Sequence, residues 1–144
     1  MSFDGSVHKQ HMRRTGKVVP PNLLLLDSCS TVDVVMNEEL LTDIRDAAVP
    51  CDISCNAGVV RVTKIGDLQG FPFPVWYNPL GIANILSLHI VGKCCHIQYD
   101  NATEGAAFRV TKPDGSIREF KPSSSGLHYW VIGEETGKDW TALV

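Results

Sequence analysis

Four consecutive leucines, Leu23 to Leu26, end directly at Asp27 and constrain the fold more than any other segment. A run of this length suits a buried β-strand and falls far short of the ~18 apolar residues that a membrane-spanning helix needs. A carboxylate at the end of a buried strand costs free energy unless it is hydrogen-bonded or functional. Asp27 is therefore a candidate for chemistry, and the alternative is that it begins a turn or caps the next segment.

Size and composition are those of one globular domain. The chain has 144 residues, of which 44% are hydrophobic and 20% are charged. Domains cluster near ~100–150 residues, and these proportions exclude wholesale disorder. The net charge of −3 and the isoelectric point of 5.9 argue against a nucleic-acid-binding core.

Short β-branched and aromatic segments predict a mostly β fold with one or two short helices. Strands are predicted over residues 23–26, 31–35, 51–55, 59–63, 75–77, 95–99, 108–111, 117–120 and 127–132. Asn37 is predicted to cap a short helix, with Leu40, Leu41 and Ile44 on its apolar face. Its solvated face would hold the acidic residues Glu38, Glu39, Asp43 and Asp46. Residues 82–91 predict a buried strand that runs into a second short helix, closed by Gly92.

Two turns are predicted from residue types that favour them. Asn56-Ala57-Gly58 separates two predicted strands, and Asn and Gly both tolerate positive φ, so this segment is predicted to be a hairpin tip. Lys112-Pro113-Asp114-Gly115 predicts a tight turn between two later strands.

Both ends of the chain have the composition of linkers, which leaves residues 22–132 as the predicted folded domain. Residues 1–21 carry a small basic group made of Lys9, Arg13, Arg14 and Lys17. Four charges provide little affinity for nucleic acid at physiological salt, so contact through residues 9–17 is not expected. Residues 133–144 are polar and predict a second linker. The N-terminus lacks the apolar stretch of a secretory signal, which indicates a reducing, cytoplasmic location with no membrane partner.

The cysteines predict free thiols rather than a disulfide framework. There are five, an odd number with two adjacent: Cys29, Cys51, Cys55, Cys94 and Cys95. We expect them to be buried and unpaired. Neither Cys51-x3-Cys55 nor Cys94-Cys95-His96 has the spacing of a zinc finger, so zinc is a minority interpretation. No metal and no cofactor are therefore expected.

Three motifs resemble those of copia-type LTR retrotransposon polyproteins. Leu24 to Thr31 (LLLDSCST) resembles the hydrophobic-hydrophobic-Asp-Ser/Thr-Gly-Ala/Ser motif of retroviral-type aspartic proteases. Asn84 to Leu88 (NILSL) resembles the Asn-Leu-Leu-Ser stretch that follows at about this distance in copia-type polyproteins. Gly126 to Tyr129 (GLHY) resembles the Gly-Leu-Tyr ending before the integrase. Together they span residues 22–132, and three motifs in the same order are more specific than any one of them.

The resemblance implies a retropepsin-like acid protease, in which one chain is half of a dimeric barrel. Asp27 of each subunit would be catalytic, and Ser28 would tie the two active-site loops together across the dimer. Ser30 would hydrogen-bond the outer carboxylate oxygen. The hairpin tip Asn56-Ala57-Gly58 would be the flap that closes over a peptide. Ile85-Leu86-Ser87 would pack behind the catalytic loop.

The count of Asp motifs agrees with a dimer. An aspartic protease needs two carboxylates that share one proton around a water. Asp27 is the only Asp of the chain that is followed by Ser or Thr, and a two-lobed enzyme would need about twice this length. One Asp per chain therefore requires two chains.

Two positions depart from the family's pattern. Cys29 stands where the family has Gly, and Ser87 stands in place of a second Gly. Because Gly lets two loops approach closely, the side chain of Cys29 could crowd the dimer axis, although the backbone N–H that faces the carboxylate is retained. A nucleophilic role for Cys29 would need a histidine partner, and His89, His96 and His128 lie far from it in the sequence.

These observations predict an aspartic endopeptidase that cuts its own polyprotein as a homodimer, within a virus-like particle by the resemblance. The alternative is a catalytically inactive descendant that keeps the fold as a binding or structural module. A third interpretation is a thiol or zinc module built on the cysteines.

Overall fold

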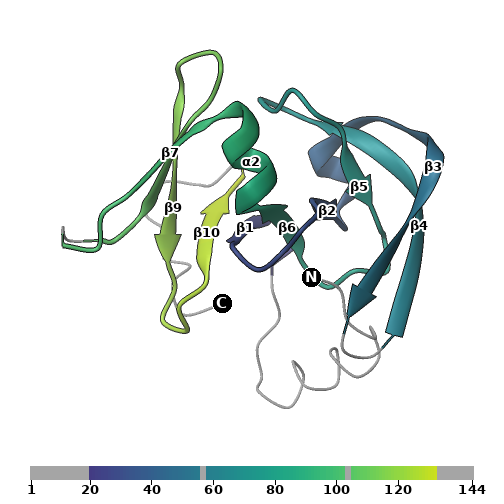
Figure 1. Ribbon diagram of the computed structural model, residues 1–144, viewed down its shortest axis with the longest axis horizontal. Helices are drawn as coiled ribbons and strands as arrows, with labels where there is room; N and C mark the ends of the chain where they lie inside the picture. Colours follow the sequence, from purple (N-terminus) through teal and green to yellow (C-terminus); the bar gives the residue numbers. More distant parts are fainter. Residues whose placement is uncertain (1–19, 56–57, 103–104, 133–144) are drawn as a thin grey trace.

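A computed structural model describes residues 20–55, 58–102 and 105–132 as a mostly β chain (Figure 1). Within these residues there are ten strands, one α-helix and one 3₁₀ turn. The first half holds β1 (Leu23–Asp27), β2 (Val34–Val35), the 3₁₀ turn η1 (Glu38–Leu40), β3 (Leu41–Cys55), β4 (Gly58–Leu68) and β5 (Val75–Tyr77). The second half holds β6 (Asn84–Ser87), α2 (Leu88–Cys94), β7 (His96–Tyr99), β8 (Phe108–Thr111), β9 (Ile117–Pro122) and β10 (His128–Val131).

The strands form one open, mixed sheet in the order β3-β4-β5-β2-β6-β1-β10-β9-β8-β7. Two neighbouring pairs, β1 with β6 and β2 with β5, are parallel, and the other pairs are antiparallel. Figure 1 shows the β3–β4 hairpin on one side of the molecule, the β7–β9 strands on the other, and α2 beside the central strands. The expected mostly β fold with a short helix is confirmed at this level.

The centre of the sheet contains one unusual insertion. Although β1 and β2 follow each other in the chain, β6 lies between them. It pairs in parallel with β1, where Asp27 is opposite Ser87, and antiparallel with β2, where Val34 is opposite Ile85. The loop of residues 28–33 therefore passes around the end of β6.

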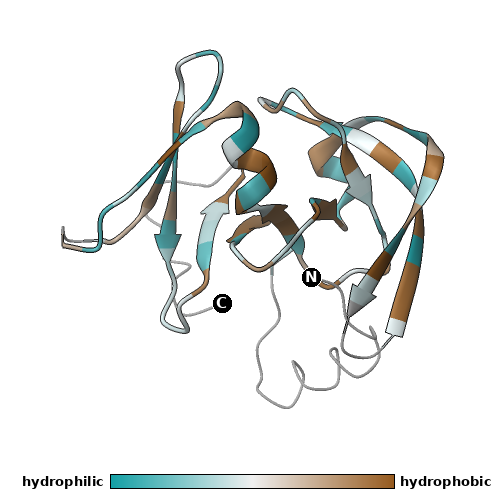
Figure 2. Ribbon diagram, viewed as in Figure 1, coloured by the Kyte–Doolittle hydropathy of each residue, from teal (hydrophilic) through white to brown (hydrophobic). Residues whose placement is uncertain are grey.

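The leucines of β1 are buried on both faces of the sheet, which explains why they do not alternate with polar residues. Leu24 and Leu26 belong to one core cluster, while Leu23 and Leu25 belong to a second cluster with Tyr129. All four leucines are at most 7% exposed. Burying one such side chain stabilises the fold by about 1.5–3 kcal/mol relative to leaving it in water. Figure 2 shows hydrophobic residues gathered on these central strands.

The predicted helix after Asn37 is wrong beyond its first turn. Asn37 does act as an N-cap, since its side chain accepts a hydrogen bond from the Glu39 amide at 3.1 Å, but the turn ends at Leu40. Leu41 begins β3 and pairs with Leu68 of β4. The local pattern favoured a helix, and pairing with a distant strand overrode it.

The acidic residues assigned to that helix fall in two different elements. Glu38 and Glu39 lie exposed in η1, as a solvated face requires, whereas Asp43 and Asp46 lie in β3. Asp46 accepts a bond from the Lys64 ammonium of β4 at 2.8 Å, and Asp43 takes a φ of 52° where the β3–β4 register shifts. Both side chains therefore belong to a strand pair.

Other local predictions are confirmed with one exception. Strand β6 runs directly into α2 as predicted, whereas the predicted helix end at Gly92 is wrong, because α2 continues to Cys94. In the turn after β8, the Gly115 amide donates to the Lys112 carbonyl at 2.9 Å, and Gly115 takes a φ of 89°. Cys55 pairs with Gly58, so β3 and β4 form the expected hairpin.

Several predictions concern residues that the structure does not describe. The hairpin-tip residues Asn56 and Ala57, residues 1–19 of the N-terminal linker with its basic group, and the linker over 133–144 lie outside the described residues. In the part that is described, no helix is long and apolar enough to cross a membrane.

Candidate active site

Asp27 is the last residue of β1 and lies partly open to solvent, in contrast to the leucines before it. Its Oδ1 accepts a hydrogen bond from the Cys29 backbone N–H at 2.8 Å. This is also the bond by which an Asp begins a turn, so the alternative local role of Asp27 is present in the structure. The result is an oriented carboxylate at the end of a strand that is rigidly packed on both faces.

Ser28 and Cys29 present exposed side chains next to this carboxylate. Ser28 Oγ and Cys29 Sγ lie 4.0 Å apart. The backbone at Cys29 does not take a positive φ, so the conformation of this loop does not itself require Gly. The N–H that was expected to face the carboxylate does so. Any crowding by Cys29 would arise between two chains.

Ser30 is buried, and its hydroxyl donates to the Val32 carbonyl at 2.7 Å. A hydroxyl has one proton, so in this conformation the Ser30 proton is directed into its own loop. The bond to the outer oxygen of Asp27 that the resemblance implies stays a prediction.

Ser87 holds the other side of the loop. Its Oγ donates to the Ser30 carbonyl at 2.7 Å, and its backbone N–H donates to Asp33 Oδ1, also at 2.7 Å. Ser87 is fully buried, and so is Leu86, while Ile85 is 6% exposed. The segment Ile85-Leu86-Ser87 thus lies directly behind residues 28–33, and the hydroxyl that replaces Gly has a specific partner.

Asp33 is a member of this site that sequence reasoning did not single out. It is 6% exposed, and burial raises its pKa to about 6, while the hydrogen bond from Ser87 acts in the opposite direction. The sequence does contain a signal for this residue, because Asp33 stands between the β-branched residues Val32 and Val34. A carboxylate buried there costs free energy unless it has a hydrogen-bond partner.

Asn84, at the other end of β6, uses both its amide donors and both acceptor positions. Its Nδ2 donates to the carbonyls of Pro21 (2.7 Å) and Leu23 (3.0 Å), and its Oδ1 accepts from the amides of Met36 (3.0 Å) and Asn37 (3.1 Å). The side chain is fully buried. Asn84 therefore joins the start of β1 to the segment after β2. The motif NILSL did not predict this role.

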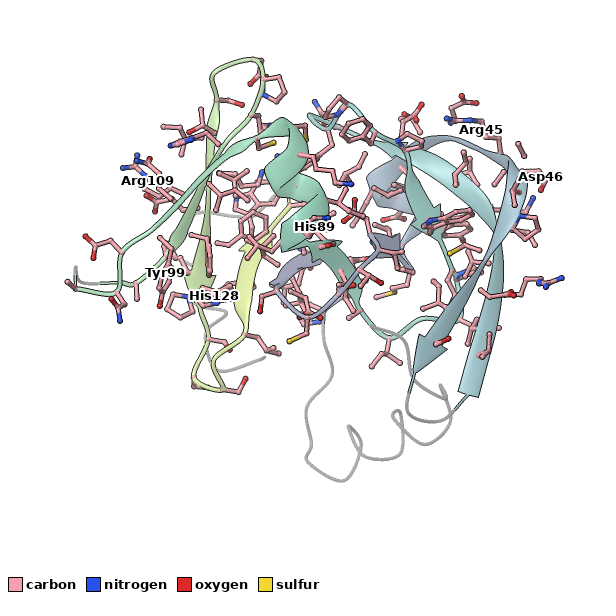
Figure 3. All side chains as sticks on the ribbon, in the orientation of Figure 1. Arg45, Asp46, His89, Tyr99, Arg109 and His128 are labelled. Atoms are coloured by element: carbon pink, nitrogen blue, oxygen red, sulfur yellow. The ribbon has the colours of Figure 1, made fainter. Side chains whose placement is uncertain are left out.

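The described cysteines and histidines are spread over several parts of the fold. The four cysteines with described side chains are free. The expectation that they are buried is confirmed for Cys95, holds only in part for the half-buried Cys51 and Cys94, and is wrong for the exposed Cys29. Within the described part of the chain, Cys29 makes no hydrogen bond to a histidine: His128 packs on Phe108 with ring centroids 4.7 Å apart, and His89 lies exposed on α2 (Figure 3). Among the described residues, no three His, Cys, Asp or Glu side chains gather as a metal site would require.

The fold and the site together define a mostly β chain in which the Asp27 carboxylate lies at the end of β1. Ser87, at the end of the neighbouring strand β6, supports the loop that follows Asp27. Comparison of the chain with protein-family models, curated proteins and solved structures found no match.

Proposed function

We propose that this chain is a retropepsin-like aspartic endopeptidase of a copia-type retrotransposon polyprotein, active as a homodimer to which each subunit contributes Asp27. The observation that carries the proposal is the position of this carboxylate. It is partly exposed at the end of a buried strand, held by the Cys29 amide, and backed by Ser87. A rigid support for a reachable carboxylate is what general acid–base chemistry needs.

Two such carboxylates side by side share one proton, because like charges in contact oppose the second ionisation. The ionised Asp27 takes a proton from a water, and the water oxygen attacks the carbonyl carbon of the peptide. The protonated Asp27 of the other subunit donates its proton to the carbonyl oxygen. Collapse of the tetrahedral intermediate then breaks the C–N bond: the first Asp27 gives the proton that it took from water to the amide nitrogen, and the second Asp27 takes a hydroxyl proton from the intermediate, which restores the shared proton. No cofactor enters this sequence.

Features around Asp27 support a dimeric arrangement. Ser28 and Cys29 are exposed beside the carboxylate, so a second loop can approach it from that side. In the resemblance, Ser28 makes the contact between the two loops. One Asp per chain cannot serve as base and acid at once, which makes the second subunit necessary for catalysis.

The β3–β4 hairpin supplies the element that would cover a bound peptide. It is long, with strands of 15 and 11 residues, and it carries exposed apolar side chains at Val49 (74%) and Val59 (64%). Exposed apolar groups on a hairpin suit contact with a polypeptide and exclusion of water from it.

The test is cleavage of a peptide that spans the chain's own flanks by the purified protein. We expect cleavage that pepstatin inhibits and that increases with dimer formation. A folded dimer that cuts no such peptide between about pH 4 and 7 would support the inactive binding or structural module instead.

A further inference from the structure

Two buried hydrogen bonds from a single residue meet on the loop that follows Asp27. Ser87 binds the Ser30 carbonyl through its hydroxyl and the Asp33 carboxylate through its amide, each at 2.7 Å. Exposed fractions are 0% for Ser87, 4% for Ser30 and 6% for Asp33. Hydrogen bonds in such a water-excluded place are strong, and an unpaired partner there is costly.

We propose that Asp33 and Ser87 form a latch that positions the Asp27 loop. They act as positioning residues, because they fix the backbone of residues 28–33 and so the direction in which the Asp27 carboxylate is presented. The link to catalysis rests on the proposed function, whereas the link to loop geometry does not.

The route from the latch to Asp27 is short. Ser87 is level with Asp27 in the parallel β1–β6 pair, so the loop leaves β1 beside the residue that holds it. Ser30 is bound through its carbonyl by Ser87 and binds Val32 through its own hydroxyl. Cys29, directly before Ser30, donates to Asp27 Oδ1. Loss of the bond to the Ser30 carbonyl therefore removes one of the contacts that fix the backbone next to the Cys29 amide.

A purely structural role for Ser87 is the competing explanation. Ser87 is also the N-cap of α2, and its Oγ accepts from the Ile90 amide at 3.3 Å. Asp33 separates the two roles, because it takes part in the latch and does not cap the helix. Asp33→Ala removes the acceptor for the Ser87 amide, whereas Asp33→Asn keeps an oxygen that can accept it.

The test is amide hydrogen exchange of the full chain by NMR. Loss of one hydrogen bond corresponds to roughly fivefold faster opening, so we expect at least this change at the Cys29 amide in Ser87→Ala and in Asp33→Ala. We expect Asp33→Asn to retain the wild-type rate. The matched control is Ser123→Ala, since Ser123 is a buried serine whose bonds stay within residues 123–127, and it should leave Cys29 unchanged.

Two results would overturn the latch. One is an unchanged Cys29 rate in both alanine variants. The other is a rise at Cys29 matched by the core amides of Val110 and Phe120, which would mean general destabilisation. If Ser87→Ala does not fold, Ser87→Gly carries the same test, since the resemblance places Gly there.

A kinetic measurement addresses the catalytic link. For a cleaving enzyme, Ser87→Ala should lower kcat by about tenfold and leave KM within about twofold, because a displaced carboxylate slows turnover more than peptide binding. Equal effects on both constants would contradict a positioning role. If wild type cuts no peptide, the proposed function fails, while the exchange experiment still decides the latch.

Discussion

Asp27 and Ser87 are direct partners in the parallel pair of β1 and β6, although they lie far apart in the sequence. This register places the candidate catalytic carboxylate beside the residue that holds its loop through Ser30 and Asp33. The loop is thus supported by a strand from the second half of the chain, and its geometry depends on packing of the whole sheet.

Asp27→Asn should abolish cleavage and leave the fold intact, because Asn is nearly isosteric and cannot act as a base. The variant should also be dominant. When wild-type and variant chains exchange freely, activity should fall as the square of the wild-type fraction, since only dimers with two carboxylates turn over. The measurement is the cleavage rate in mixtures of wild-type and variant chains at a fixed total protein concentration. A linear fall would show that each chain acts alone and would exclude the shared dyad.

Cys29→Gly should raise activity or tighten the dimer if the Cys29 side chain crowds the second loop. Because the backbone at Cys29 needs no positive φ, the chain itself should change in stability by less than about 1 kcal/mol. Cys29→Ala is the control, since it keeps Cβ and removes only sulfur. Dimer dissociation constants and cleavage rates for all three proteins test this, and identical values would remove crowding as an explanation.

Asp33 should make stability fall as pH rises. Burial raises its pKa from 3.8 to about 6 in the folded chain, so the folded state holds this proton more tightly than the unfolded state. That contribution favours folding fully below the unfolded value of 3.8 and is lost as the pH rises through about 6. The difference corresponds to roughly 3 kcal/mol.

Urea unfolding of wild type and Asp33→Asn at the same protein concentration checks this. Between about pH 4 and pH 7, the free energy of unfolding of wild type should fall by roughly 2–3 kcal/mol relative to the variant. Hydrogen bonds from Lys64 and Arg61 lower the pKa values of Asp46 and Asp52, so these two groups make stability rise with pH. They do so in both proteins, and comparison with the variant therefore isolates the contribution of Asp33. Parallel pH curves would show that Asp33 is not the responsible group.

Asn84→Ala should destabilise the fold by about 3 kcal/mol, because it removes the side-chain partner of the Leu23 carbonyl and of the Met36 and Asn37 amides. The Pro21 carbonyl loses one of its two donors and keeps Asn37 Nδ2 at 2.9 Å. Asn78→Ala is the matched control, since the side chain of Asn78 accepts one bond, from the Leu80 amide at 3.1 Å, and it should cost about 1 kcal/mol or less. Denaturant unfolding measures both. Similar losses in the two variants would mean that the four bonds of Asn84 contribute little.

A chain reduced to residues 20–132 should keep its thermal midpoint within about 5 °C, because neither end segment carries an apolar pattern that a core could use. Thermal unfolding of the two chains at equal concentration tests this. A larger loss would show that a terminal segment contributes to the sheet or to a dimer, and it would move the domain boundaries.

Local chemistry was enough to predict several parts of this protein. Unbroken leucines predicted a buried strand with Asp27 at its end. Turn chemistry predicted the Lys112–Gly115 turn and the β3–β4 hairpin, because Gly and Asn tolerate positive φ wherever they occur. The apolar residues within 82–91 predicted the strand that runs into α2. These features depend on neighbours in the chain, so the sequence by itself determined them.

Other features were decided only by the tertiary structure. Leu41 and Ile44 have helical spacing, yet they lie in β3 because pairing with β4 stabilises a strand there. The insertion of β6 between β1 and β2, the four bonds of Asn84 and the contacts of Ser87 with Ser30 and Asp33 all join residues distant in sequence. Hydrophobic periodicity and secondary-structure propensity describe one segment at a time, whereas these contacts exist only once the sheet has brought separate segments together. For that reason the sequence by itself was enough to select Asp27 as a candidate, and only the tertiary structure decided which residues contact its loop.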